Sequence, residues 1–412
     1  MFIFAPHSYT QGLTACGHPL PLSPFFNQDN LKCMTNYNLS FWERDSFLDR
    51  DFIVIGGGII GLSAAISLRE RAPNASILVL ERGIFPSGAS TKNAGFACFG
   101  SLTEILSDYK RIGENATLEV IERRWRGLHI LRNRLGDQAI GFEQYGGYEL
   151  LFDEQASAIE QINHVNSLLH PLFSRDVFSV NTAAVAQFGL NADLVNSVVE
   201  NPFEGQIHTG KMMLALTRYA SERGIEIRTG VNVTHLTESG SHVEVACRHE
   251  GQTLHCTAAH VAVCTNALIP DLLPELSIKP GRGQVLITAP IEDLKIKGAF
   301  HFDEGFYYFR NVGDRVLFGG GRNLDFEGEE TPEFRLTSNI QDTLEQLLTS
   351  VILPDTPFNI EQRWAGIMGF STTKMPVVTR PTERITVGFG CNGMGVALGS
   401  EIGSTTAALC CA

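Results

Sequence analysis

The chain has 412 residues, of which 43% are hydrophobic and 19% charged, and its formal net charge is −13. This length can form two or three domains with sizeable cores. The acidic balance argues against a nucleic-acid partner, which requires a basic face, and no apolar run approaches the roughly 20 residues of a transmembrane helix. The nine cysteines form no C-x-x-C pair, so we expect reduced thiols, no metal site and a cytoplasmic protein.

Residues 1–50 are expected to form an N-terminal extension. Its first 33 residues contain four prolines and show no hydrophobic periodicity, which predicts a disordered tail. Met34 offers a more conventional start than Met1 and lies shortly before the first predicted strand. Both starts remain open at this point.

A glycine-rich turn between a strand and a helix follows this extension. Residues 52–55 form an uninterrupted apolar run typical of a buried parallel strand, and residues 59–71 have the spacing of an amphipathic helix. Gly56, Gly58 and Gly61 have the spacing of a dinucleotide-binding turn, in which they allow a tight turn, the approach of a pyrophosphate and close helix packing. The N-terminus of the helix favours an anion at that place.

A second apolar strand over 77–80 ends in Glu81. This carboxylate stands about 25 residues after Gly56, near the position at which an acidic side chain accepts hydrogen bonds from a ribose. Residues 85–95 then form a loop of small and polar residues, which can present backbone N–H groups and hydroxyls to a ligand. The alternative is a surface loop beside a surface glutamate.

The middle of the chain mixes helices with strands that alternate in polarity. Helices are expected over 102–112, 117–135, 154–169, 210–223 and 332–348, with Thr209 as the N-cap of the fourth. Strands are expected over 148–152, 225–228, 231–236, 243–248, 253–257, 260–264, 283–288, 305–310, 315–320 and 361–368. The alternation over 231–257 predicts a small antiparallel meander.

A second strand–glycine turn–helix unit closes the sequence. Residues 385–389 are predicted to form a strand, 390–395 a glycine-rich turn and 396–409 a helix. A purely structural turn is the simpler interpretation of one such unit. Two units at opposite ends of the chain favour a shared ligand, because the helix N-terminus would place a positive dipole beside a negatively charged ring.

Together these segments resemble the D-amino-acid oxidase family of FAD-dependent oxidoreductases, which includes glycine, sarcosine and gamma-glutamylputrescine oxidases. The motifs that carry the resemblance lie at 55–61, 80–82, 87–90, 93–95, 281–284, 306–310, 319–321, 364–366 and 390–395. The resemblance implies an α/β protein with a Rossmann-like FAD-binding domain over 51–142, 207–277 and 376–412. The second, discontinuous domain, over 143–206 and 278–375, would be an α+β substrate domain built on a large mixed or antiparallel sheet.

The resemblance also implies the cofactor and its contacts. FAD would be bound without a covalent bond, since no cysteine occurs between Trp364 and Pro376, where covalent relatives attach it. The cofactor-binding residues would be Gly56, Gly58, Ile59, Ile60, Gly61, Glu81, Arg82, Ser90, Thr91, Asn93, Ala94, Gly95, Val233, Gly393, Met394 and Gly395. No catalytic acid or base is nominated, because the family reaction removes a hydride from a carbon that bears an amine, and a neutral amine needs no side-chain base.

The substrate is expected to be a small amine or amino acid, and the electron acceptor oxygen or another oxidant. Met368 and Asn392 stand where relatives that oxidise amino acids often have arginines, which favours an amine without an α-carboxylate. Arg310 and Arg322 are the alternative, as a relocated carboxylate clamp, and Tyr308 is a candidate for the pocket wall. Two other functions remain open: an FAD- and NAD(P)H-dependent hydroxylase, and a protein that binds FAD without catalysis.

Overall fold

The structure, a computed structural model, describes residues 39–412 of the chain. The predicted disordered tail over 1–33 and the choice between Met1 and Met34 lie outside the described residues. Within the described part, no helix has both the length and the apolar character that crossing a membrane requires. The first element is α1 (Phe41–Phe47), a short helix in the predicted extension with a Ser40–Glu43 capping box.

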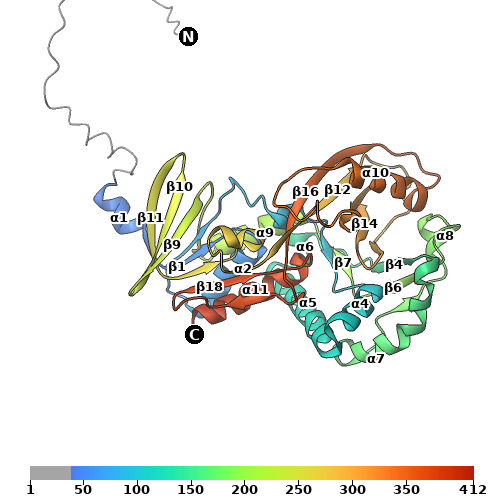
Figure 1. Ribbon diagram of the computed structural model, residues 1–412, viewed down its shortest axis with the longest axis horizontal. Coiled ribbons are helices and arrows are strands. Elements are labelled where there is room, and N and C mark those ends of the chain that lie inside the picture. Colours follow the sequence, from blue (N-terminus) through green and yellow to red (C-terminus); the bar gives the residue numbers. More distant parts are fainter. Residues whose placement is uncertain (1–38) are drawn as a thin grey trace, which may run out of the picture.

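The first sheet has a parallel core around the strand of the first glycine turn (Figure 1). Its strands run in the order β17 (Val377–Thr379), β18 (Ile385–Phe389), β11 (Gln252–Val263), β1 (Asp49–Ile55), β2 (Ile77–Leu80) and β8 (Glu226–Arg228), with β9 (Asn232–Ser239) and β10 (His242–His249) as an antiparallel extension of β11. β1 pairs in parallel with both β2 and β11. Residues 53–55 are therefore enclosed on both edges and are almost fully buried.

Four helices cover this sheet: α2 (Ile59–Arg71), α5 (Glu114–Leu135), α9 (Thr209–Ser221) and α11 (Gly395–Cys410). α11 lies against both α2 and α5 (Figure 1). A Cβ at Gly127 of α5 would lie 2.0 Å from the carbonyl oxygen of Ala397, and one at Gly403 of α11 would lie 2.6 Å from that of Ile60. The three helices approach one another this closely because glycines occupy the crossings.

The second sheet is mixed and mostly antiparallel. Its order is β16 (Ile360–Phe370), β12 (Lys279–Thr288), β15 (Arg315–Gly320), β14 (Tyr307–Val312), β13 (Ala299–Phe302), β4 (Gly147–Leu151), β6 (Ser197–Asn201) and β5 (Ser179–Val180), and only the β13–β4 pair is parallel. Tyr307 and Phe309 pack in the core beneath α10 (Ser338–Leu347). Tyr308 therefore faces the opposite side of the sheet.

Shorter elements complete the fold. They are α3 (Ala89–Lys92), α4 (Leu102–Ile112), α6 (Asp137–Ile140), α7 (Ile162–Phe173), α8 (Ala184–Phe188) and a two-stranded ribbon of β3 (Phe96–Ala97) and β7 (Gly205–Gln206). The predicted α/β class with a parallel-cored sheet and a second, mixed sheet is confirmed. The first sheet draws its strands from 49–55 and from the three segments assigned to the FAD-binding domain, and the second from the other two segments. The domain boundaries themselves stay a prediction that this strand membership supports.

Several local predictions were wrong. The strands expected over 253–257 and 260–264 are one strand, β11, because residues 257 and 258 pair with β10 on one side and β1 on the other. The helix expected from 154 begins with a 3₁₀ segment, Asp153–Gln161, and α7 follows it. α9 is capped by the side chain of His208 instead of Thr209. The helix expected from 332 begins at Ser338, because the Gln284 side chain binds the backbone of Thr337.

Candidate cofactor and substrate cavity

A cavity of about 700 Å³ is lined by residues of both sheets. This is within the usual size range of ligand sites. Most predicted site residues line it: Gly56, Gly58, Ile59, Ile60, Glu81, Arg82, Ser90, Asn93, Ala94, Gly95, Val233, Tyr308, Arg322, Gly393, Met394 and Gly395. Gly61, Thr91 and Arg310 are the predicted residues that do not line it.

The glycines of the first turn lie in close contact with neighbouring protein atoms. Gly56 has φ +105°, and a Cβ there would lie 2.7 Å from the carbonyl oxygen of Cys264. A Cβ at Gly61 would lie 1.8 Å from the carbonyl oxygen of Gly56, so Gly61 acts in packing instead of on the cavity wall. A Cβ at Gly58 would lie 2.8 Å from Oγ of Ser90, which accepts a hydrogen bond from the Ile59 N–H at 2.9 Å. The N-terminus of α2 therefore opens on the cavity, and the hydroxyl of Ser90 lies against it.

Glu81 is held by backbone donors at the end of β2. Its Oε2 accepts from the N–H of Gly57 and its Oε1 from that of Gly83, both at 2.8 Å. A carboxylate oxygen has two lone-pair sites, so each oxygen keeps one for another donor. The side chain is thus fixed in place and able to accept from a ribose diol.

The segment after Glu81 folds around α3. Oγ1 of Thr91 donates to the carbonyl of Pro86 at 2.6 Å. The amide of Asn93 donates to the carbonyls of Ala89 and Ser90, and its oxygen accepts from Gly95. Thr91 and Asn93 therefore fix the conformation of residues 86–95, here called the strap, which border the cavity. The side chain of Thr91 does not itself line the cavity.

The second glycine turn brings α11 to the same cavity. Gly390 and Gly393 have positive φ, and Met394 is the N-cap of α11. The side chain of Asn392 accepts from the N–H of Ser371 and donates to the carbonyl of Lys374. Asn392, at a position where related enzymes are expected to bind substrate, closes this turn structurally.

Arg310 does not have the position predicted for a substrate contact. It is 6% exposed, and its guanidinium donates to the carbonyls of Ala94, Ile207 and Asn311. Burial lowers the pKa of this guanidinium to about 10. Its role in this structure is to tie β14 to the strap and to the segment before α9.

Arg322 lies on the cavity wall in the short 3₁₀ helix Arg322–Leu324. Its guanidinium carbon is 4.2 Å from the ring centre of Phe370 and 4.9 Å from that of Phe326. Among residues 39–412 it forms no ion pair, because Glu330 and Glu329, the carboxylates that attract it electrostatically, are paired with Lys279 and Arg282. Burial lowers its pKa from the ordinary arginine value, and cation–π contact compensates part of the lost hydration.

The side chain of Tyr308 lies over the glycine-rich floor of the second sheet. A Cβ at Gly319 would lie 2.8 Å from its ring, and one at Gly283 would lie 3.7 Å from its hydroxyl and 2.9 Å from the Met368 methyl group. A Cβ at Gly281, two residues along β12, would lie 3.6 Å from Nη1 of Arg322. Residues i and i+2 of a strand share one face. The side chains of Tyr308 and Arg322 therefore lie over neighbouring positions on the same face of β12.

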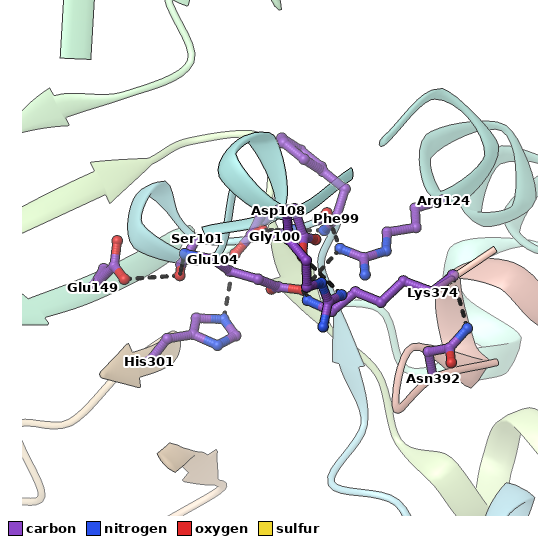
Figure 2. Close-up of polar contacts among 12 residues, drawn as sticks. Phe99, Gly100, Ser101, Glu104, Asp108, Arg124, Glu149, His301, Lys374 and Asn392 are labelled. Carbon is purple, nitrogen blue, oxygen red and sulfur yellow. Dashed lines mark hydrogen bonds and ion pairs between the residues drawn. The ribbon is translucent and has the colours of Figure 1, made fainter. Parts of the chain in front are cut away.

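A group of buried ionisable side chains at another part of the wall was missed from the sequence. Figure 2 shows His301 and Glu149 on one side of Glu104, and Arg124 and Lys374 on the other. His301 and Glu104 line the cavity. The sequence feature that could have revealed this group is a histidine between Phe300 and Phe302. In a strand the histidine side chain points to the face opposite the two phenylalanines.

These arrangements fit a bound dinucleotide flavin. The N-terminus of α2 suits a pyrophosphate, Glu81 a ribose, and the N-terminus of α11 a ring that becomes negatively charged on reduction. The two glycine turns reach one cavity because α2 and α11 pack together.

Comparisons with known proteins agree with this geometry. A model of the family described as FAD dependent oxidoreductase (DAO) matches residues 51–409. Gamma-glutamylputrescine oxidoreductase of Escherichia coli is 25% identical over 366 residues, which cover 84% of this chain and 80% of that protein.

Two solved structures share the fold. L-proline dehydrogenase from P. horikoshii has a TM-score of 0.70 at 19% identity, over 88% of this chain and 93% of that one. Glycine oxidase from Geobacillus kaustophilus has a TM-score of 0.68 at 20% identity, over 86% and 93%. Since the family model spans nearly the whole described chain, and both glycine turns and Glu81 meet at one cavity, this protein belongs to the DAO family of FAD-dependent oxidoreductases.

Proposed function

We propose that the protein oxidises the C–N bond of a small amino acid to an imine, with FAD bound without a covalent bond. The observation that carries this proposal is the guanidinium of Arg322, which lies on the cavity wall between two aromatic rings without a carboxylate partner among the described residues. A partly buried cation of this kind is stabilised when an anion binds beside it. The sequence alone favoured an amine; the position of Arg322 now favours its alternative, an amine that carries a carboxylate.

The cofactor-binding residues are proposed as predicted, except for Gly61 and Thr91, whose positions indicate structural roles. Arg310, predicted as a substrate contact, is set aside for the same reason. Three cysteines line the cavity, Cys98, Cys264 and Cys391. Burial raises the pKa of the Cys391 thiol to about 12 and also raises that of Cys264, and burial together with Glu204 and Glu104 raises that of Cys98 well above its ordinary value. Because the thiolate is the nucleophile, none of these cysteines is suited to form a covalent bond with the flavin.

Tyr308 would assist Arg322 in holding the carboxylate. Burial raises the pKa of its hydroxyl to about 12, so this group stays protonated at neutral pH and can donate a hydrogen bond. The hydroxyl of Tyr308 lies beside Gly283 and Nη1 of Arg322 beside Gly281, two residues of β12 that share one face. Two such donors fix both position and orientation, whereas Met368 offers only an apolar contact.

The cofactor, when bound, supplies the acceptor for two electrons. The chain's own residues bind the carboxylate, exclude water with the apolar wall formed by Phe96 and Met368, and hold the carbon that bears the amine on the side of the cavity that the cofactor would occupy. Oxygen or another oxidant would then take up the electrons.

The test uses pairs of compounds that differ by one carboxylate, such as alanine with ethylamine and sarcosine with dimethylamine. Each is mixed anaerobically with the FAD-loaded protein, and bleaching of the flavin is followed. We expect the carboxylated member to reduce the flavin at least tenfold faster at low concentration, about 1.4 kcal/mol. Arg322→Met should remove this preference.

Arg335→Met is the matched control, because Arg335 lies in the same loop, is exposed and does not line the cavity. If ethylamine and dimethylamine are the better substrates, or if Arg322→Met and Arg335→Met behave alike, the carboxylate proposal is wrong.

A further inference from the structure

His301 occupies a row of side chains that crosses the second sheet towards the cavity. It pairs with Glu149 of β4 on one side and with Tyr308 of β14 on the other. The residue is 7% exposed and lines the cavity. The ring of Phe96 packs edge-on against both His301 and Tyr308, at 5.1 and 5.6 Å between ring centres. An imidazole is therefore built into the wall next to the proposed substrate floor.

Glu204 lies beside one ring nitrogen of this imidazole. Nε2 of His301 is buried and has no hydrogen-bond partner among the described residues, and Oε2 of Glu204 lies 3.5 Å from it, within ion-pair distance. The other oxygen of Glu204 accepts from the N–H groups of Phe99 and Gly100. Because that carboxylate is anchored by the backbone and is 1% exposed, its second oxygen is directed at His301.

The remaining ionisable groups around His301 come from three other elements. Glu149 accepts from Ser101 and Thr103, and burial raises its pKa despite these hydrogen bonds. Glu104 of α4 is paired with Arg124 and with Lys374. Burial acts to raise the Glu104 pKa, but these two cations lower it overall.

The other neighbours of His301 do not carry charge. The Sγ of Cys98 lies within 4.8 Å of the ligand atoms of His301 and Glu204, and its raised pKa keeps the thiol neutral. Tyr308 is neutral for the same reason. The charge of Arg124 is engaged with Glu104 and that of Lys374 with Asp108 and Glu104, so among the described residues His301 is the group able to balance Glu204.

We propose that His301 accepts the proton that the substrate ammonium must lose before its C–N bond can be oxidised, and that Glu204 is the residue that positions it. This inference rests on the proposed function, since it assumes a substrate with an ammonium group. Glu204 fixes the tautomer with hydrogen on Nε2, which leaves the lone pair of Nδ1 for the substrate. An N–H bond of the ammonium breaks, an Nδ1–H bond forms, and no electrons are transferred in this step.

The assignment has a measurable pH signature. Burial acts to lower the pKa of His301, but Glu204, Glu149 and Glu104 outweigh it and raise the pKa above the ordinary histidine value. The neutral imidazole, which can accept a proton, therefore becomes abundant only as the pH rises through this raised pKa. Reduction of the flavin should accelerate over the same range, and removing the charge of Glu204 should move that range to lower pH.

Two variants and a control test the proposal: His301→Gln, Glu204→Gln, and His170→Gln at an exposed position on α7. The first measurement is the titration of His301 by NMR of histidine-labelled, FAD-loaded protein. The second is the pH profile of anaerobic flavin reduction by an amino acid. Flavin content by absorbance shows whether each variant still holds the cofactor.

We expect His301→Gln to slow reduction at least tenfold at neutral pH and to abolish the inflection, with flavin content unchanged. Glu204→Gln should shift both the NMR titration and the inflection to lower pH by about one unit, and His170→Gln should change neither. A wild-type pH profile in His301→Gln, or an NMR titration of His301 that Glu204→Gln leaves in place, overturns the proposal. If no amino acid or amine bleaches the wild-type flavin, the proposed function fails, and the NMR titration still decides whether Glu204 controls the proton on His301.

Discussion

Removing one member of the buried ion pair between Arg282 and Glu329 should destabilise the protein strongly. Nε of Arg282 donates to Oε2 of Glu329 at 2.9 Å and Nη2 to Oε1 at 2.5 Å, with side chains 0% and 1% exposed. The replacement Glu329→Gln keeps the shape of the side chain but leaves a buried cation without its counter-charge. Breaking a buried pair in this way costs about 3–5 kcal/mol, which is a large part of the stability of an ordinary domain.

The chain provides a matched control next to this pair. Lys279 and Glu330 join the same strand to the same loop at 2.8 Å, but their side chains are 64% and 43% exposed. Exposed pairs contribute about 0–1 kcal/mol, so Glu330→Gln should be nearly neutral. Urea unfolding followed by tryptophan fluorescence would measure both variants.

The double replacement Arg282→Met with Glu329→Leu provides a second check, because exchanging both members of a buried pair for apolar residues is often neutral. It should recover most of the loss caused by Glu329→Gln. Equal, small effects of Glu329→Gln and Glu330→Gln would refute the reasoning, since burial would then not determine what an ion pair contributes.

Four further outcomes are expected. Gly61→Ala should abolish flavin retention, measured by absorbance, because its Cβ would lie 1.8 Å from the Gly56 carbonyl oxygen; Gly88→Ala, which meets nothing within 4 Å, should be tolerated. Acid precipitation should leave the yellow colour in the supernatant, and a yellow pellet would contradict non-covalent binding. His301→Gln should lower stability to urea most below about pH 6.5 and progressively less as the pH rises through the raised pKa of His301; a pH-independent difference would exclude this linkage. Tyr308→Phe should slow amino-acid oxidation by a factor that is constant between about pH 6 and pH 9, because the hydroxyl pKa is about 12, and a factor that varies there would indicate another role.

Local sequence patterns were sufficient for the first glycine turn. The apolar run at 52–55 lies in β1, the helix predicted over 59–71 has the bounds of α2, and Glu81 directly follows β2. These features depend on neighbours in the sequence: an apolar strand, glycines at fixed spacing and a proline after the helix. Such signals can be read without knowledge of the rest of the fold.

Contacts between distant segments could not be read in this way. Arg310 was expected to meet substrate, but its partners are backbone carbonyls of residues 94 and 207, which no sequence pattern places beside β14. His301 meets Glu204 only because β13 pairs in parallel with β4. Thr209 looked like an N-cap, yet its hydroxyl donates to Asn93 and leaves the cap to His208. Tertiary partners decided each of these cases.

The close packing of α11 on α2 has a consequence for how the protein is made. The turn that begins α2 leaves the ribosome about 330 residues before α11 does, which at roughly 5–20 residues per second is a delay of tens of seconds. During that interval the face of α2 that Gly399 and Gly403 will contact has no partner, and the second glycine turn of the cavity does not yet exist. Flavin loading should therefore be one of the last events in the maturation of this chain, and nascent chains that stop before α11 should emerge colourless.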